Sequence, residues 1–200
     1  MSGTLTIRRA YAGEAALAAY ILARAFDDDP VAAWLVPDLA ARPAVLDAFF
    51  GVFTAFGVEA GEVHIDQSER GASLWLPFDP SDAHDDPELG EALAAVYGPY
   101  AERFGMFDAL TAAQHPAQVA HAYLPFIGVK PEGQGRGIGG NLLEARLRDL
   151  DVSGTPAYLE ASTLDSARLY ARHGFEFLPK SIDLPDGPSL YPMWREPRAA

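Results

Sequence analysis

The chain has 200 residues, of which 49% are hydrophobic, and its formal net charge is −13. This length predicts a single domain over residues 1–200, with one sizeable core. The acidic balance argues against DNA or RNA as a partner, and the lack of cysteine excludes disulfides and a cysteine nucleophile. The start of the chain lacks the features of a secretory signal, and the most apolar stretch, 15–26, is too short to cross a bilayer. We therefore expect a cytoplasmic protein without membrane contact.

The first half of the chain predicts a strand, then helices and a hairpin. Apolar residues alternate with polar ones around Leu5 and Ile7, as in a half-buried strand. An alanine-rich helix over about 13–26 should end at Asp27-Asp28-Asp29-Pro30, because proline disfavours helical geometry at the residue before it. Phenylalanines at helical spacing within 44–58 predict a core helix. The other elements expected here are a helix from about residue 31 and paired strands over 62–66 and 72–78.

The second half alternates helical and strand patterns, as in an α/β fold. An acidic, proline-flanked segment over 79–87 is expected to be a loop. The elements predicted after it are helices over 87–104 and 107–120, a strand over 121–129, a helix over 137–150, a strand over 157–160, a helix over 164–173, and strands over 175–178 and 190–194.

The strongest chemical signal lies where the 121–129 strand leads into a glycine-rich loop that opens a helix. Glycines leave backbone amides uncovered, and a helix start directs its unpaired amides and its positive dipole end outward. Arg136 and Lys130 add local positive charge to an acidic protein. We therefore predict a pyrophosphate-binding loop, here called the glycine loop, which consists of Gln134, Gly135, Arg136, Gly137, Ile138, Gly139 and Gly140.

A dinucleotide-binding loop is a rival interpretation. Gly135, Gly137 and Gly140 fit the G-x-G-x-x-G fingerprint, and Glu160 could be the acid that binds a ribose. In that fold, however, the first glycine directly follows the strand, whereas residues 130–134 intervene here. The residues after Gly140 are also too few for a doubly wound sheet. A dinucleotide-dependent oxidoreductase is therefore the less favoured alternative.

Two motifs, in this order along the chain, resemble those of the GNAT superfamily of acyl-CoA-dependent N-acyltransferases. Its pyrophosphate loop has the pattern [Gln or Arg]-x-x-Gly-x-[Gly or Ala] after a strand that ends in Val-x-Pro. The matching residues are Val129, Pro131, Gln134, Gly137 and Gly139. The second motif is a strand over 158–162 and a helix that ends in Tyr-x-x-x-Gly-Phe at 170–175. Together the motifs cover residues 120–178. Their residues are similar to those of the branch that contains puromycin N-acetyltransferase.

The resemblance implies a GNAT-like fold, in which a mostly antiparallel sheet contains a splayed parallel strand pair and is flanked by helices. It implies that acetyl-CoA binds with its pantetheine arm in the splay, beside Ile127, Gly128 and Val129. It also implies that Tyr170 is the general acid near the sulfur, although many helical tyrosines only pack in a core. Ser166 stands where many members have an asparagine that contacts the arm, and its reach is shorter.

The predicted acceptor is a small primary amine. Glu160 ends a strand beside the glycine loop, where it can anchor an ammonium or take its proton. Asp27, Asp28 and Asp29 end a helix that walls the acceptor pocket in the family, and carboxylates are unfavourable at that end of a helix. We therefore expect them to bind the amine. Alternatively, Asp29-Pro30 only marks a break in the chain and the other two aspartates face water.

The histidines lack the spacing of metal ligands, and His121 is expected to be a structural residue with its hydrogen bonds satisfied. The acidic cluster over 79–86 is interpreted as a solvated loop, so no metal site is predicted. Two functions within the GNAT superfamily stay open, an active N-acetyltransferase and an acyl-CoA sensor or scaffold without turnover. The presence of Tyr170 favours the enzyme.

Overall fold

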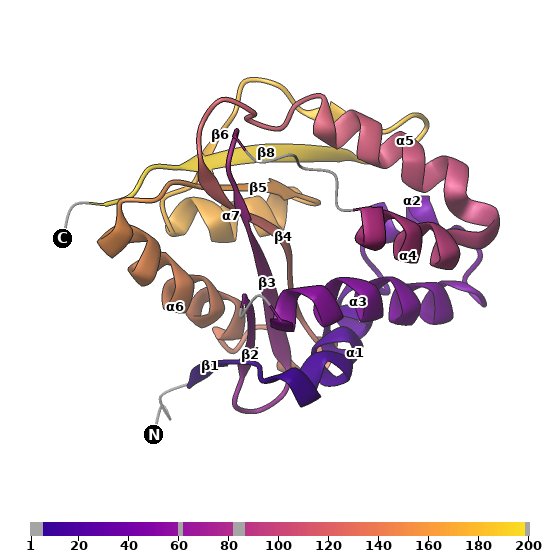
Figure 1. Cartoon of the computed structure of the whole chain (residues 1–200), viewed down its shortest axis with the longest axis horizontal. Coiled ribbons are helices and arrows are strands. Elements are labelled where there is room, and N and C mark those ends of the chain that lie inside the picture. Colours follow the sequence, from indigo (N-terminus) through magenta and orange to yellow (C-terminus); the bar gives the residue numbers. More distant parts are fainter. Residues whose placement is uncertain (1–5, 60–61, 82–86, 199–200) are drawn as a thin grey trace.

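A computed structural model describes residues 6–59, 62–81 and 87–198, so Leu5 of the predicted first strand lies outside it. One mixed sheet runs through the molecule in the order β1-β2-β3-β4-β5-β8-β6, and β7 pairs with β8 (Figure 1). The strands are β1 Ile7–Arg9, β2 Val63–Asp66, β3 Gly71–Phe78, β4 His121–Val129, β5 Ala157–Ala161, β6 Glu176–Phe177, β7 Ile182–Asp183 and β8 Ser189–Arg195. Only β4 and β5 are parallel among these pairs of described strands, which confirms the predicted mixed sheet.

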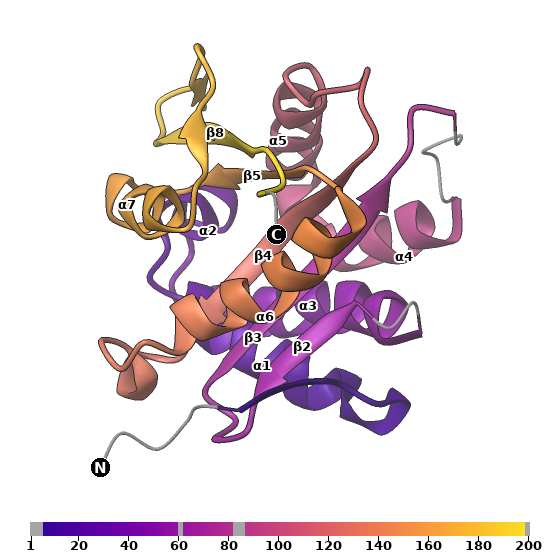
Figure 2. The ribbon, with the colours of Figure 1, turned by 90° about the vertical axis from the view of Figure 1, so that its left-hand side faces the viewer.

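Helices cover both faces of the sheet. They are α1 Ala15–Phe26, α2 Pro30–Leu35, α3 Arg42–Glu59, α4 Pro87–Tyr97, α5 Ala101–Ala112, α6 Ile138–Ser153 and α7 Leu164–Arg172, with short 3-10 turns at Ala12–Glu14, Gly98–Tyr100 and Pro131–Gly133. Helices α1 and α3 lie on one face and α6 on the opposite one, and each face has its own apolar core (Figure 2). Of the described helices, none combines the length and apolar character needed to cross a membrane.

The strands β4 and β5 separate soon after they meet. They pair only over 122–123 of β4, whereas β4 stays paired with β3 along most of its length. The β3–β4 register shifts between Leu74 and Leu76, and Pro125 lies in the β4 segment opposite this shift. Because proline has no amide hydrogen, it suits a point where a ladder is interrupted. The predicted splay is therefore present, and the β4 edge that faces β5 has no strand partner over 124–129 among the described residues.

The helices before β4 differ from the prediction. A helix was expected to continue over 87–104, but α4 ends at Tyr97 and α5 begins at Ala101. Gly98 has a positive φ of 51°, and Pro99 cannot donate the helical hydrogen bond, so the chain turns between the two helices. Helix α5 also ends at Ala112, earlier than expected. The short strand β7 was not predicted.

Candidate active site

The glycine loop connects β4 to α6 in a conformation that requires glycine. Gly135 and Gly137 have φ values of 72° and 81°, in the left-handed region that side chains rarely adopt. Gly137 is the N-cap of α6, and no side chain caps this end of the helix. The side-chain amide of Gln134 donates a hydrogen bond of 3.1 Å to the backbone carbonyl oxygen of Val129, which stabilises the loop. The first amides of α6 therefore have no carbonyl partner within the helix and are available for an anion.

The other loop residues have distinct surroundings. Ile138 is 2% exposed, so its side chain is part of the core. A Cβ atom on Gly139 would lie 3.3 Å from Leu169. A Cβ atom on Gly140 would meet His173 at the same distance, so these two glycines let α7 approach the start of α6. Arg136 is exposed.

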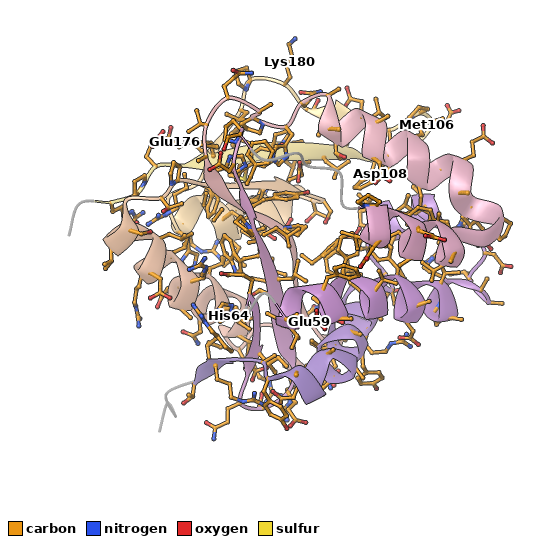
Figure 3. The ribbon with its side chains drawn as sticks, in the orientation of Figure 1. Glu59, His64, Met106, Asp108, Glu176 and Lys180 are labelled. Atoms are coloured by element: carbon orange, nitrogen blue, oxygen red, sulfur yellow. The ribbon has the colours of Figure 1, made fainter. Side chains whose placement is uncertain are left out.

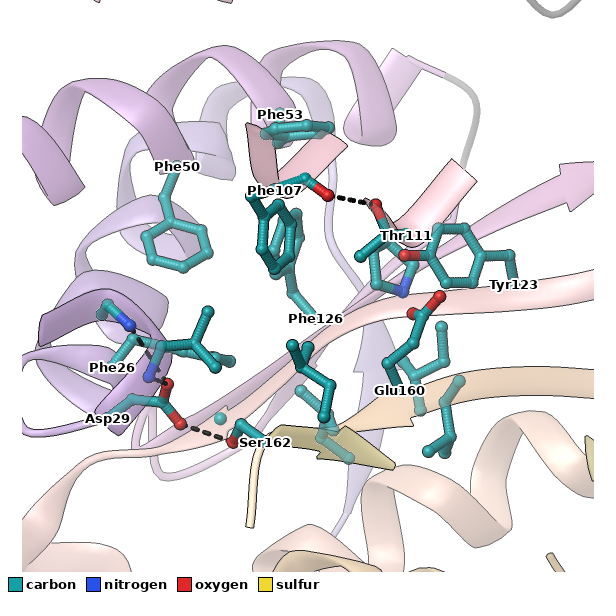
Figure 4. Close-up of a pocket in the computed structure, with 18 of the residues that line it drawn as sticks. Phe26, Asp29, Phe50, Phe53, Phe107, Thr111, Tyr123, Phe126, Glu160 and Ser162 are labelled. Carbon is teal, nitrogen blue, oxygen red and sulfur yellow. Dashed lines mark hydrogen bonds between the residues drawn. The ribbon is translucent and has the colours of Figure 1, made fainter. Parts of the chain in front are cut away.

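A cavity of about 940 Å³ joins the glycine loop to the space beneath α3, α4 and α5 (Figure 4). The predicted site residues that line it are Asp29, Ile127, Gly128, Val129, Gln134, Gly139, Glu160, Ser166 and Tyr170. The cavity is not lined by Gly135, Arg136, Gly137, Ile138, Gly140, Asp27 or Asp28. The five loop residues of this second group are sequence neighbours of Gln134 and Gly139, which do line the cavity. Asp27 and Asp28 do not line it.

Tyr170 lies on α7 and is 8% exposed, with its ring packed edge-on against Phe175 at 6.1 Å. Burial, together with the nearby charge of Asp29, raises the pKa of Tyr170 well above its usual value. No hydrogen bond of its hydroxyl is found among the described residues. The hydroxyl therefore keeps its proton at neutral pH and has no competing partner there, as a proton donor requires.

Glu160 lies on β5 and directs its carboxylate toward Tyr123 (Figure 4). Burial raises the pKa of Glu160 to about 7, although the nearby hydroxyls of Tyr158 and Tyr123 favour the charged form. Its Oε1 atom is buried without a hydrogen-bond partner in the described part of the chain. A carboxylate with a pKa near neutrality can accept a proton from a substrate and release it again.

Asp29 is used by the fold itself. Its Oδ1 atom accepts hydrogen bonds of 2.8 and 3.3 Å from the amides of Val31 and Ala32, which makes it the N-cap of α2. The Ser162 hydroxyl donates a hydrogen bond of 2.5 Å to Oδ2 (Figure 4). The carboxylate therefore stabilises the start of the next helix, which accounts for an acid at this break. Asp28 is exposed.

Comparisons with known proteins agree with this geometry. Residues 100–177 match the family described as acetyltransferase (GNAT) domain. A solved structure described as histone acetyltransferase HPA2 and related acetyltransferase, from Corynebacterium glutamicum, is 25% identical, with a TM-score of 0.73 over 99% of each chain. The part of the chain that matches the GNAT acetyltransferase domain contains the glycine loop, Glu160 and Tyr170. The similarity to the puromycin N-acetyltransferase branch stays a prediction.

Two further solved structures share the fold of this GNAT domain. Drosophila melanogaster polyamine N-acetyltransferase is 19% identical, with a TM-score of 0.67 over 96% of this chain and 99% of that one. Arylalkylamine N-acetyltransferase 2 from Aedes aegypti is 12% identical, with a TM-score of 0.69 over 98% of this chain and 100% of that one. At these identities the likeness shows the GNAT fold alone.

Ser166 has a structural role in the GNAT domain. Its backbone amide donates a hydrogen bond of 3.0 Å to the Thr163 hydroxyl, and its own hydroxyl accepts one of 3.3 Å from the Thr163 backbone amide. These contacts form the capping box at the start of α7. The side chain also lines the cavity. Contact with the pantetheine arm stays a prediction, and that contact would have to compete with the cap.

Phenylalanine side chains line the part of the cavity that lies away from the glycine loop. This lining was not predicted from the sequence. We call this part the aromatic chamber, and it consists of Phe49, Phe53, Phe104, Phe107 and Phe126. The predicted core stripe of α3 therefore has two roles, because Phe49, Phe50 and Phe53 pack in the core and also line the cavity. Core and pocket aromatics follow the same helical spacing, so periodicity could not separate them.

His121 belongs to the framework of the fold. His121 is 2% exposed, and its ring nitrogens lie 2.7 Å from the Val119 carbonyl oxygen and 3.1 Å from a ring nitrogen of His115. This confirms the structural role predicted for His121. Within the described ranges, no group of three or more His, Asp or Glu side chains is arranged to hold a metal ion. Residues 82–86 of the acidic cluster lie outside those ranges.

Proposed function

We propose that this GNAT domain transfers the acetyl group of acetyl-CoA to a small primary amine within a ternary complex. The observation that carries the proposal is the continuous cavity. It is lined near the glycine loop by Gln134 and Gly139, and farther along by Tyr170 and Glu160. The charged side chains on its lining, taken over the described residues, are all acids, namely Asp29, Asp108 and Glu160. An acidic lining favours a cationic acceptor.

The proposed position of acetyl-CoA follows from two groups of backbone atoms. The glycine loop and the uncapped start of α6 suit the pyrophosphate, because unpaired amides and the positive end of a helix dipole attract anions. The β4 edge over 127–129 lines the cavity and lacks a strand partner toward β5, so it can hydrogen-bond the pantetheine amides. In the proposed complex the thioester lies between Tyr170 and Glu160.

The proposed reaction uses these two side chains in sequence. Glu160, directly or through a water, takes a proton from the ammonium, which leaves a nucleophilic amine. The amine nitrogen forms a bond with the acetyl carbon, and the bond from that carbon to sulfur breaks. Tyr170 donates its proton to the departing thiolate and is reprotonated as the nitrogen loses its remaining extra proton. The products are an N-acetyl amine and free CoA, with one proton released overall.

Acetyl-CoA binding by calorimetry tests the cofactor site. Gly137→Val should weaken binding by at least tenfold, or about 1.4 kcal/mol, because it covers the amides and strains a residue with a φ of 81°. Gly154→Val is the matched control, since Gly154 has a φ of 68° at the opposite end of α6 and a Cβ atom there would meet nothing within 4 Å. Equal affinities in the two variants would remove the loop from the site.

Turnover can then be followed by the CoA thiol that the reaction releases. The chain has no cysteine, so the protein adds no thiol background to such an assay. A panel of primary amines should release thiol in proportion to N-acetyl product. Acetyl-CoA binding without acetylation of any amine in the panel would instead support the sensor function.

A further inference from the structure

The three acids that line the cavity differ in what surrounds them. Asp29 already accepts hydrogen bonds from two backbone amides and from the Ser162 hydroxyl. Asp108, on α5 (Figure 3), is an exposed residue, yet burial of its carboxyl group raises its pKa, so water screens its charge only in part. Glu160 differs from both, because its Oε1 atom is buried and has no hydrogen-bond partner among the described residues. Glu160 is therefore the lining acid with a buried oxygen left for a positive charge.

The cavity near Glu160 is walled mainly by aromatic rings, with the side chains of Thr111 and Tyr123 close to the carboxylate (Figure 4). The ring centroids of Phe53 and Phe126 are 5.0 Å apart, and those of Phe49 and Phe104 are 5.5 Å apart. Figure 4 shows the labelled rings of Phe53, Phe107 and Phe126 above the hollow that the Glu160 carboxylate faces. Rings that pack on one another keep a fixed shape, and such a wall stabilises apolar groups that leave water. A second ammonium in the chamber would lose most of its water, and the lining acid left to pair with it would be the exposed Asp108.

We propose that the acceptor is a primary monoamine with a bulky apolar body, either aromatic or a long alkyl chain. Its ammonium binds at Glu160 and its body fills the aromatic chamber. The inference rests on the proposed function and names the substrate class of the same site. It makes diamines and polyamines poorer acceptors, because their second ammonium would leave water among aromatic rings, with the partly exposed Asp108 as its available carboxylate.

A matched pair of amines tests the proposal. Hexylamine and 1,5-diaminopentane have the same number of heavy atoms and differ in whether a methyl group or a second ammonium ends the chain. With saturating acetyl-CoA at pH 8, kcat/KM for hexylamine should exceed that for 1,5-diaminopentane by about 30-fold or more, because a cation loses far more than a methyl group when it leaves water. 2-Phenylethylamine should likewise exceed ethylamine by about tenfold or more, since its ring becomes buried.

Variants locate the preference in the chamber. Phe107→Ala should reduce the ratio of hexylamine to 1,5-diaminopentane at least about threefold, because it removes an apolar wall and admits water. Phe177→Ala is the control, since Phe177 is 53% exposed on β6 and does not line the cavity, and it should keep the ratio. Thermal unfolding and acetyl-CoA binding show whether each variant is folded. If Phe107→Ala does not fold, the amine series with the unaltered protein decides.

The possible outcomes separate this inference from the proposed function. Acetylation that prefers 1,5-diaminopentane would overturn the inference and leave the N-acetyltransferase proposal intact, and Asp108→Asn would then show whether Asp108 holds the second ammonium. Equal rates for the two amines would also overturn it. If acetyl-CoA binds and no amine is acetylated, the proposed function fails, and this inference fails with it.

Discussion

Replacing Glu160 by glutamine should change how the stability of the protein depends on pH. Burial raises the pKa of Glu160 from 4.5 to about 7 in the folded protein. Between these two values the unfolded chain has lost the proton whereas the folded protein still holds it. Because stability falls with rising pH wherever the folded state binds more protons, the Glu160 contribution is complete below pH 4.5 and is lost as the pH rises through about 7.

The size of the effect follows from the two pKa values. The interval from 4.5 to about 7, at about 1.36 kcal/mol for each pKa unit, corresponds to ~3 kcal/mol. The glutamine side chain of the Glu160→Gln variant is uncharged at all these pH values. The variant therefore does not lose this stability as the pH rises. Relative to the unaltered protein, the variant should therefore gain about 3 kcal/mol in free energy of unfolding between pH 4.5 and pH 8.

Urea unfolding of both proteins across this pH range measures the difference. The many other carboxylates titrate in both proteins, so their contributions cancel in the comparison. Glu176→Gln is the matched control, because Glu176 is an exposed carboxylate on the short strand β6 (Figure 3). The control should differ from the unaltered protein by a constant amount. A Glu160→Gln difference that also stays constant within about 0.5 kcal/mol would refute a buried carboxylate with a raised pKa.

Two further substitutions test other parts of the site. Tyr170→Phe should lower kcat by about 100-fold while acetyl-CoA affinity holds, because it removes the proton donor and keeps the buried ring. Steady-state kinetics and calorimetry measure this, with the exposed Tyr11→Phe as control, and an unchanged kcat would leave Tyr170 a packing role only. Asp29→Ala should lower the free energy of unfolding by about 1–2 kcal/mol, because α2 loses its cap and Ser162 its acceptor, whereas Asp29→Asn should cost less. Equal losses in urea unfolding would contradict the capping role.

Local features were predicted well from the sequence. The glycine loop, the helix after it and the strands on either side depend on residues close together in the chain, so spacing and glycine content identify them. The break at Gly98 was missed because a glycine and a proline were read as part of a helix, although together they favour a turn. The acids at 27–29 were only partly understood. Asp29 caps the helix that follows it, and its bond to Ser162 joins segments far apart in the sequence.

The sequence by itself determined the sheet-and-helix pattern, the glycine loop and the candidates Tyr170 and Glu160, because each depends on local pattern or motif. Tertiary structure alone decided which of these face a common cavity and how their chemistry is altered. Glu160 gains a pKa near 7 because folding removes water from its carboxylate, and no local pattern encodes that desolvation. Likewise, the aromatic chamber exists because α3, α5 and β4 converge. These elements are far apart in the sequence, and the spacing of residues within each one does not show that they meet.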